Sequence, residues 1–71
     1  MTKTELMRLE AYLRKMFHND ALEVRPQPKK KDMAEIFIGG EFIAPIYRDD
    51  EDGEVSYQVQ MAILEMDLAE I

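Results

Sequence analysis

The sequence contains no cysteine and only one histidine, His18. Neither a disulfide framework nor a zinc site built from cysteine and histidine can therefore form. Nucleophilic catalysis also lacks its groups, because there is no thiol and Thr2, Thr4 and Ser56 belong to no serine-hydrolase motif. We therefore expect no catalytic residue, no metal and no cofactor, and we do not expect an enzyme.

Long apolar runs are missing as well. No run approaches the roughly 20 apolar residues of a membrane-spanning helix, and charged residues interrupt the N-terminal segment too often for a signal peptide. We expect a cytoplasmic protein that does not enter a membrane. Its 71 residues fit one small domain, 1–71, of marginal stability, and association with a partner is the support that remains.

Basic residues are scarce in the second part of the chain. Residues 1–40 hold eight basic and six acidic residues, a balance of +2, whereas residues 41–71 hold one basic and nine acidic residues, a balance of −8. The two balances add up to the net charge of −6. A chain with this dipolar distribution does not attract nucleic acid or anionic lipid over its whole surface.

The first segment has the pattern of an amphipathic helix. Thr2 and Glu5 match a capping box, in which side chains satisfy unpaired backbone donors. Apolar residues then recur at helical spacing, at Leu6, Leu9, Leu13, Met16 and Phe17. Asn19 tolerates a left-handed backbone and is the expected stop. The pattern predicts a helix over residues 3–18.

Four strands are predicted after the helix, where the apolar period changes to two. They cover residues 22–25, 34–38, 41–47 and 55–66, with a polar loop at 27–32 and turns at 39–40 and 49–53. Residues 61–71 also fit the helical period, so a final helix is the alternative to a long last strand. The predicted fold is α+β: an N-terminal helix packed on a four-stranded, mainly antiparallel sheet (α-β-β-β-β). The position of the first strand in the sheet stays open.

The turns at 39–40 and 52–53 predict the register of the last three strands. Two-residue loops place Phe37 opposite Phe42 and Ile46 opposite Val59. One face then carries Phe37, Phe42, Ala44, Ile46, Tyr57, Val59, Met61 and Ile63, and we expect it to pack on Leu9, Leu13 and Phe17. Because one helix covers one face, the other face holds the candidate interaction residues Ile36, Ile38, Ile43, Tyr47, Leu64 and Met66.

The basic loop is a second candidate site. Arg25, Lys29, Lys30 and Lys31 surround two prolines and could hold the phosphates of a nucleic acid or of a smaller ligand. However, no aromatic residue is interleaved for base stacking, and Asp32 follows directly. A solvated loop is therefore the simpler interpretation.

The acidic turn and His18 have structural interpretations. Residues 49–54 lack the ligand spacing of an EF-hand calcium loop, and their charges suit an exposed hairpin tip. His18 lies at the predicted helix end, where a positive charge interacts favourably with the helix dipole. Neither feature is expected to bind a metal or to take part in catalysis.

Four segments, 28–32, 39–43, 49–53 and 56–64, carry a resemblance that runs over nearly the whole chain. They resemble a family of short alphaproteobacterial proteins described only as a domain of unknown function. The resemblance implies a bacterial cytosolic protein and supplies no catalytic residue, ligand or partner. We interpret the chain as a non-enzymatic protein-interaction module that binds a protein partner or forms a homodimer. Nucleic-acid or phosphate binding through residues 29–31 is the alternative, although we do not expect nucleic acid as the partner.

Overall fold

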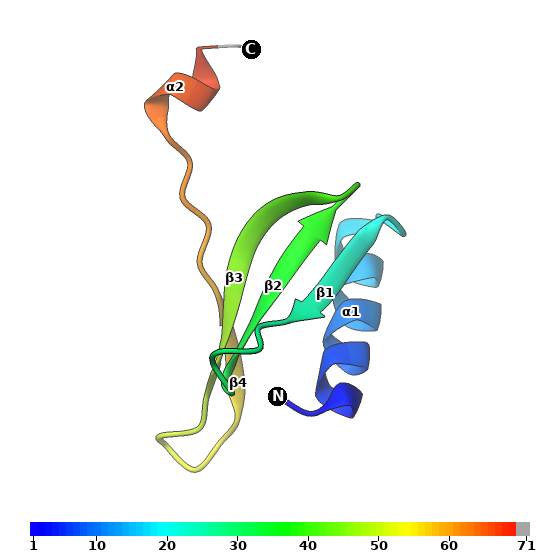
Figure 1. Cartoon of the computed structure of the whole chain (residues 1–71), viewed down its shortest axis with the longest axis vertical. Coiled ribbons are helices and arrows are strands. Elements are labelled where there is room, and N and C mark those ends of the chain that lie inside the picture. The colour runs from blue at the N-terminus through cyan, green and yellow to red at the C-terminus, as the bar shows by residue number, and fades with distance from the viewer. Residues whose placement is uncertain (70–71) are drawn as a thin grey trace.

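A computed structural model describes residues 1–69 of the chain. Helix α1 (Lys3–Phe17) is followed by strands β1 (Leu22–Pro26), β2 (Met33–Ile38), β3 (Glu41–Asp49) and β4 (Ser56–Val59), and then by the short helix α2 (Glu65–Leu68). The strands form one antiparallel sheet in the order β1-β2-β3-β4, and α1 packs on one face of it (Figure 1). The predicted α+β fold is confirmed, and β1 lies beside β2.

The capping box of α1 forms as the sequence predicts. The Glu5 N–H donates to Thr2 Oγ1 (3.1 Å), and the Thr2 N–H donates to Glu5 Oε1 (2.9 Å). The helix ends at Phe17, and His18 takes the left-handed conformation (φ 52°) that the sequence assigned to Asn19. Asn19 instead accepts a hydrogen bond from the Ala21 N–H (2.9 Å), so its side chain shapes the turn into β1.

The left-handed backbone at His18 gives a first prediction. A residue with a Cβ atom loses about 1–2 kcal/mol in this conformation, whereas glycine loses none. Glycine also makes the unfolded chain more flexible, at a cost of about 0.5–1 kcal/mol. We expect His18→Gly to raise the free energy of unfolding in urea by about 0.5 kcal/mol. Asn19→Gly is the control and should lower it; a decrease for both variants would contradict the prediction.

The core lies between α1 and the sheet face that α1 covers. Its buried side chains are Leu13, Leu22, Val24, Ala34, Ile36, Ala44 and Ile46. They come from α1 and from the first three strands, while β4 contributes only partly buried Tyr57. The helix therefore covers the sheet mainly at its β1 side and leaves the β4 side open.

A β-bulge in β3 changes which residues face the helix. Phe37 lies opposite Phe42 as predicted, but Ile36 lies opposite Ala44, so Ile43 is an extra residue between the two pairs. Beyond the bulge, Ala44 shares a face with Ile36 rather than with Phe37. The prediction that Phe37 and Phe42 face α1 is therefore wrong, and Phe42 is 48% exposed.

The same bulge corrects half of the predicted interaction face. Ile36 is buried in the core, and Ile38 and Ile43 pack against it. Tyr47 stays on the outer face of the sheet, half-buried and opposite Gln58. Several residues predicted to be in the core are instead exposed, namely Phe17, Val59, Met61 and Ile63.

Strand β4 is shorter than the predicted strand over residues 55–66. Ile46 lies opposite Val59 as predicted, and the next residue, Gln60, donates its N–H to the Pro45 carbonyl (3.2 Å). An antiparallel pair of this kind normally has a second hydrogen bond, but Pro45 has no N–H to donate to the Gln60 carbonyl. The bulge at Ile43 lies two residues away from Pro45 in β3. The ladder stops here, and the chain leaves the sheet (Figure 1).

Residues 61–69 form neither the long strand nor one continuous helix. After an extended stretch, α2 makes a single turn in which the Leu64 N–H donates to the Asp67 carboxylate (3.1 Å). The helical alternative is thus correct only for Glu65–Leu68. Its last two positions, 70 and 71, lie outside the described residues.

The two edges of the sheet differ in their protection. At the β1 edge, the Val24 N–H donates to Glu10 Oε2 (3.0 Å) and Arg14 Nε donates to the Leu22 carbonyl (2.7 Å). These helix side chains block the pairing of another strand at β1. Within residues 1–69, no side-chain hydrogen bond of this kind covers the outer edge of β4.

Candidate functional site

The basic residues predicted to hold an anion are not gathered at one point. Arg25 extends over the outer face of the sheet, where its guanidinium carbon lies 4.0 Å from the centroid of the Phe37 ring. It also pairs with Glu23 at 3.3 Å. Arg25 is therefore engaged by an aromatic ring and a carboxylate, away from the three lysines of the loop.

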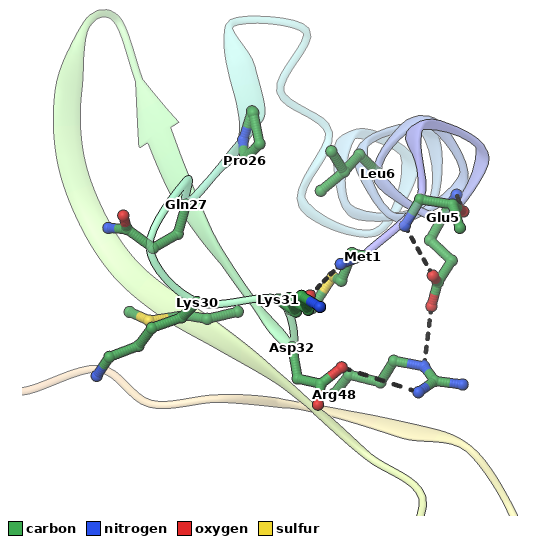
Figure 2. Close-up of a pocket in the computed structure, with 11 residues that line it drawn as sticks. Met1, Glu5, Leu6, Pro26, Gln27, Lys30, Lys31, Asp32 and Arg48 are labelled. Atoms are coloured by element: carbon green, nitrogen blue, oxygen red, sulfur yellow. Dashed lines mark hydrogen bonds and ion pairs between the residues drawn. The ribbon is translucent and has the colours of Figure 1, made fainter.

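The loop lysines differ in their surroundings. Lys30 and Lys31 contribute to a pocket of about 540 Å³ between the N-terminus, the loop and β3 (Figure 2), whereas exposed Lys29 does not line it. The pocket is lined by Met1, Thr2, Glu5, Leu6, Pro26, Gln27, Lys30, Lys31, Asp32, Met33 and Arg48. The Met1 amino group donates to the Lys31 carbonyl, which closes one side of this pocket.

An ion-pair cluster occupies the wall of this pocket (Figure 2). Arg48 Nε lies 3.0 Å from Glu5 Oε2, and Arg48 Nη1 lies 2.9 Å from Asp50 Oδ2 and 3.9 Å from Asp32 Oδ1. Tyr57 donates its hydroxyl to the same Glu5 oxygen at 2.7 Å. Arg48 Nε is shielded from solvent and forms no hydrogen bond within residues 1–69, so its contact with the Glu5 carboxylate is an ion pair. The arginine is thus committed to protein carboxylates and is not free for an anion.

The electrostatics of the cluster hold Glu5 in its ionised form. The Thr2 backbone hydrogen bond, the Tyr57 hydroxyl and the Arg48 charge outweigh partial burial and lower the pKa of Glu5 to about 2. The hydrogen bond to Glu5 raises the pKa of Tyr57. Burial opposes the charge of Arg48, but Asp50 and Glu5 outweigh it and raise the pKa of Arg48. A carboxylate that is ionised throughout the physiological range cannot serve as a general acid near neutral pH.

Sequence reasoning found only one part of this cluster. The capping box identifies Glu5 as a helix cap, but Tyr57 lies 52 residues further along the chain. The cluster joins the first turn of α1 to β3 and β4, and its geometry serves that structural link.

The acidic turn does not form a metal site in the described part of the chain. Asp50 pairs with Arg48, and Asp49 Oδ1 accepts a hydrogen bond from the Glu51 N–H (3.1 Å). Within residues 1–69 no three carboxylates or histidines are grouped so that they could hold a metal ion together.

A second hollow, here called the α1–β4 groove, opens where α1 leaves the sheet uncovered. It measures about 420 Å³ and is lined by Glu5, Arg8, Leu9, Tyr12, Leu13, Met16, Ile46, Tyr57 and Val59. Seven of these side chains are apolar or aromatic, and three of the seven, Tyr12, Met16 and Val59, are exposed. The sequence shows the apolar spacing of α1 but cannot show that part of this stripe lacks a covering element.

Residues 60–68, here called the C-terminal arm, form the most apolar exposed segment. Its large apolar side chains, each 53–71% exposed, are those of Met61, Ile63, Leu64, Met66 and Leu68. Two predicted interaction residues, Leu64 and Met66, therefore lie on this arm and not on a face of the sheet. The arm extends away from the helix and sheet (Figure 1).

Comparisons with known proteins add a family but no activity. Neither the curated proteins nor the solved structures contain a match to this chain. Neither α1 nor α2, the helices of residues 1–69, has the length and apolar character of a membrane-crossing helix. One family model does match, over residues 5–67, which include all four strands and most of both α1 and α2. The chain therefore belongs to a family described as a protein of unknown function, DUF3126.

Proposed function

We propose that the chain is a non-catalytic protein-interaction module that binds a protein partner through the C-terminal arm and the α1–β4 groove. The observation that carries the proposal is the exposure of five large apolar side chains within nine consecutive residues of the arm. Soluble monomers seldom expose contiguous apolar patches larger than a few hundred Å². Methionine, present twice in the arm, suits adaptable binding surfaces.

The non-catalytic part of the proposal rests on residue chemistry. The chain has no thiol, and Glu5 is held ionised by its neighbours rather than near the pKa of a general acid. We further propose an alphaproteobacterial cytosol as its location, on the strength of the family resemblance, and no cofactor.

Photo-crosslinking in cells tests this function. A photoreactive residue placed at Met66, on the arm, should give specific adducts with protein. The same residue at Lys29, an exposed position in the loop, is the control and should give few. Equal protein adducts at both positions, or none at Met66, would contradict the proposal. Adducts with nucleic acid at Lys29 would favour the alternative.

Replacing Lys29, Lys30 and Lys31 together by alanine is the second prediction. The three side chains are exposed, and exposed charges contribute little to stability, so the free energy of unfolding should change by less than about 0.5 kcal/mol. We also expect that neither the wild type nor this variant binds single- or double-stranded nucleic acid at physiological salt in a filter-binding assay. Salt-dependent binding by the wild type that the variant loses would replace the interaction module with a nucleic-acid binder.

A further inference from the structure

We propose that the partner is a second copy of this chain, and that the two copies exchange their C-terminal arms, each arm lying in the α1–β4 groove of the other copy. This inference rests on the proposed function and names its partner. It assigns one binding segment and one receptor site, both present in every chain. A reciprocal exchange closes after two copies, as in the common two-fold dimers.

The arm and the groove match in apolar character. On the groove side, α1 contributes Leu9, Tyr12 and Met16, and the sheet contributes Ile46 and Val59. Three of these residues, Tyr12, Met16 and Val59, lie at the mouth of the groove and are 45–61% exposed. Docking of the arm would cover apolar surface on both copies at once.

The arm and the groove also match in charge. The charged residues of the arm are Glu65 and Asp67, and it has no basic residue. At the rim of the groove lies Arg8, which is exposed and forms no ion pair with any residue in the range 1–69. Glu5 also lines the groove, but Arg48 pairs with its carboxylate at 3.0 Å. An acidic apolar segment therefore meets a mainly apolar groove whose unpaired charge, on Arg8, is positive, and charge complementarity of this kind favours specific association.

The path of the chain explains why the arm is available to another copy. Pro45 cannot donate to Gln60, so the arm leaves its own sheet and projects from the body (Figure 1). Helix side chains block the opposite edge of the sheet at β1. The arm and the open side around β4 are thus the part of the molecule left for self-association, as in exchanged-segment dimers.

Sedimentation equilibrium of the full chain over a hundredfold concentration range tests the exchange. The wild type should approach twice the chain mass, and Leu64→Asp should raise the dissociation constant at least tenfold. Val55→Asp is the matched control, because Val55 is about as exposed as Leu64 (50% and 55%) but lies just before β4, at the end of the strand away from the arm. This variant should leave the constant unchanged. Circular dichroism checks that both variants keep the fold.

Mixing two defective variants tests the arm–groove contact itself. Tyr12→Asp damages the groove and keeps the arm, whereas Leu64→Asp damages the arm and keeps the groove. Each variant alone should be a monomer, but an equal mixture can form a dimer with one intact contact and should associate more strongly than either alone. In the same way, Arg8→Glu should weaken the dimer, and Glu65→Lys with Asp67→Lys in that background should restore part of it.

The outcomes separate this inference from the proposed function. A wild type that stays a monomer up to high micromolar concentration overturns the exchange, whether the arm folds onto its own groove or stays in solvent. If Met66 then crosslinks to a different protein in cells, the interaction module stands and only the partner is wrong. A dimer that Leu64→Asp leaves intact, or a mixture with no gain in association, also overturns the exchange.

Discussion

Replacing Ile46 by alanine is expected to lower the free energy of unfolding by about 2–5 kcal/mol. Ile46 is 1% exposed, and it lies on β3 where the sheet faces α1. A chain of this length has roughly 4–10 kcal/mol of stability in total, so the variant should be only marginally folded. Urea unfolding followed by circular dichroism, at one protein concentration, measures the change.

Two companion variants make this test specific. Ile46→Val removes one methylene group and should cost about 0.5–1.5 kcal/mol, which keeps the protein folded if alanine does not. Phe42→Ala is the matched control in the same strand, because the bulge places Phe42 on the outer face in edge-to-face contact with Phe37 (5.7 Å between centroids). Its loss should be about 1 kcal/mol. A loss of 3 kcal/mol or more would instead support the core that the unbulged register predicts.

Acid should destabilise the protein through Glu5. Its pKa in the folded protein is about 2, against an ordinary value of 4.5, so the folded state binds this proton less readily than the unfolded state. The stabilisation is complete above about pH 5 and is lost as the pH falls toward 2. A full conversion of the pKa difference gives about 3.5 kcal/mol at about 1.4 kcal/mol per pKa unit; screening by solvent reduces our expectation to about 1–2 kcal/mol.

The variant Glu5→Gln isolates this contribution from those of the other carboxylates. Its free energy of unfolding should be about 1–2 kcal/mol below that of the wild type at pH 7, and the difference should shrink steadily between pH 5 and pH 2. Glu54→Gln is the same change at an exposed turn residue and is the control for the loss of one negative charge. If the difference for Glu5→Gln does not depend on pH, the cluster with Tyr57 and Arg48 does not stabilise the ionised form.

Much of the fold follows from local patterns that act over a few residues. The capping box at Thr2 and Glu5, the apolar spacing of α1 and the glycine pair at 39–40 predict elements whose bonds form between near neighbours. The pairing of β3 with β4 was also predictable, and Ile46 does lie opposite Val59. The loop between β3 and β4 is longer than the predicted two residues at 52–53, because the last pair of the two strands is Asp49 with Ser56.

The candidate site was much less predictable. Arg25 and the loop lysines are neighbours in sequence, but alternation along a strand turns Arg25 to the outer face, onto Phe37. Leu64 and Met66 are exposed apolar residues, but the long last strand predicted from the sequence places them on a sheet face that they do not reach. No sequence pattern predicts the α1–β4 groove, because its walls come from α1, β3 and β4. The groove exists only because α1 leaves this part of the sheet uncovered.

Residue type and spacing are enough to predict the α+β class, the order of the helix and the four strands along the chain, and the apolar, acidic character of the C-terminal arm. Which sheet face is buried, and where the last strand ends, depend instead on contacts between elements. A single extra residue, Ile43, exchanges the faces of a strand whose side chains alternate, so Ile36 enters the core and Phe42 leaves it. Likewise, Pro45 ends the ladder only because its missing N–H points toward β4, a direction that the neighbouring strands set.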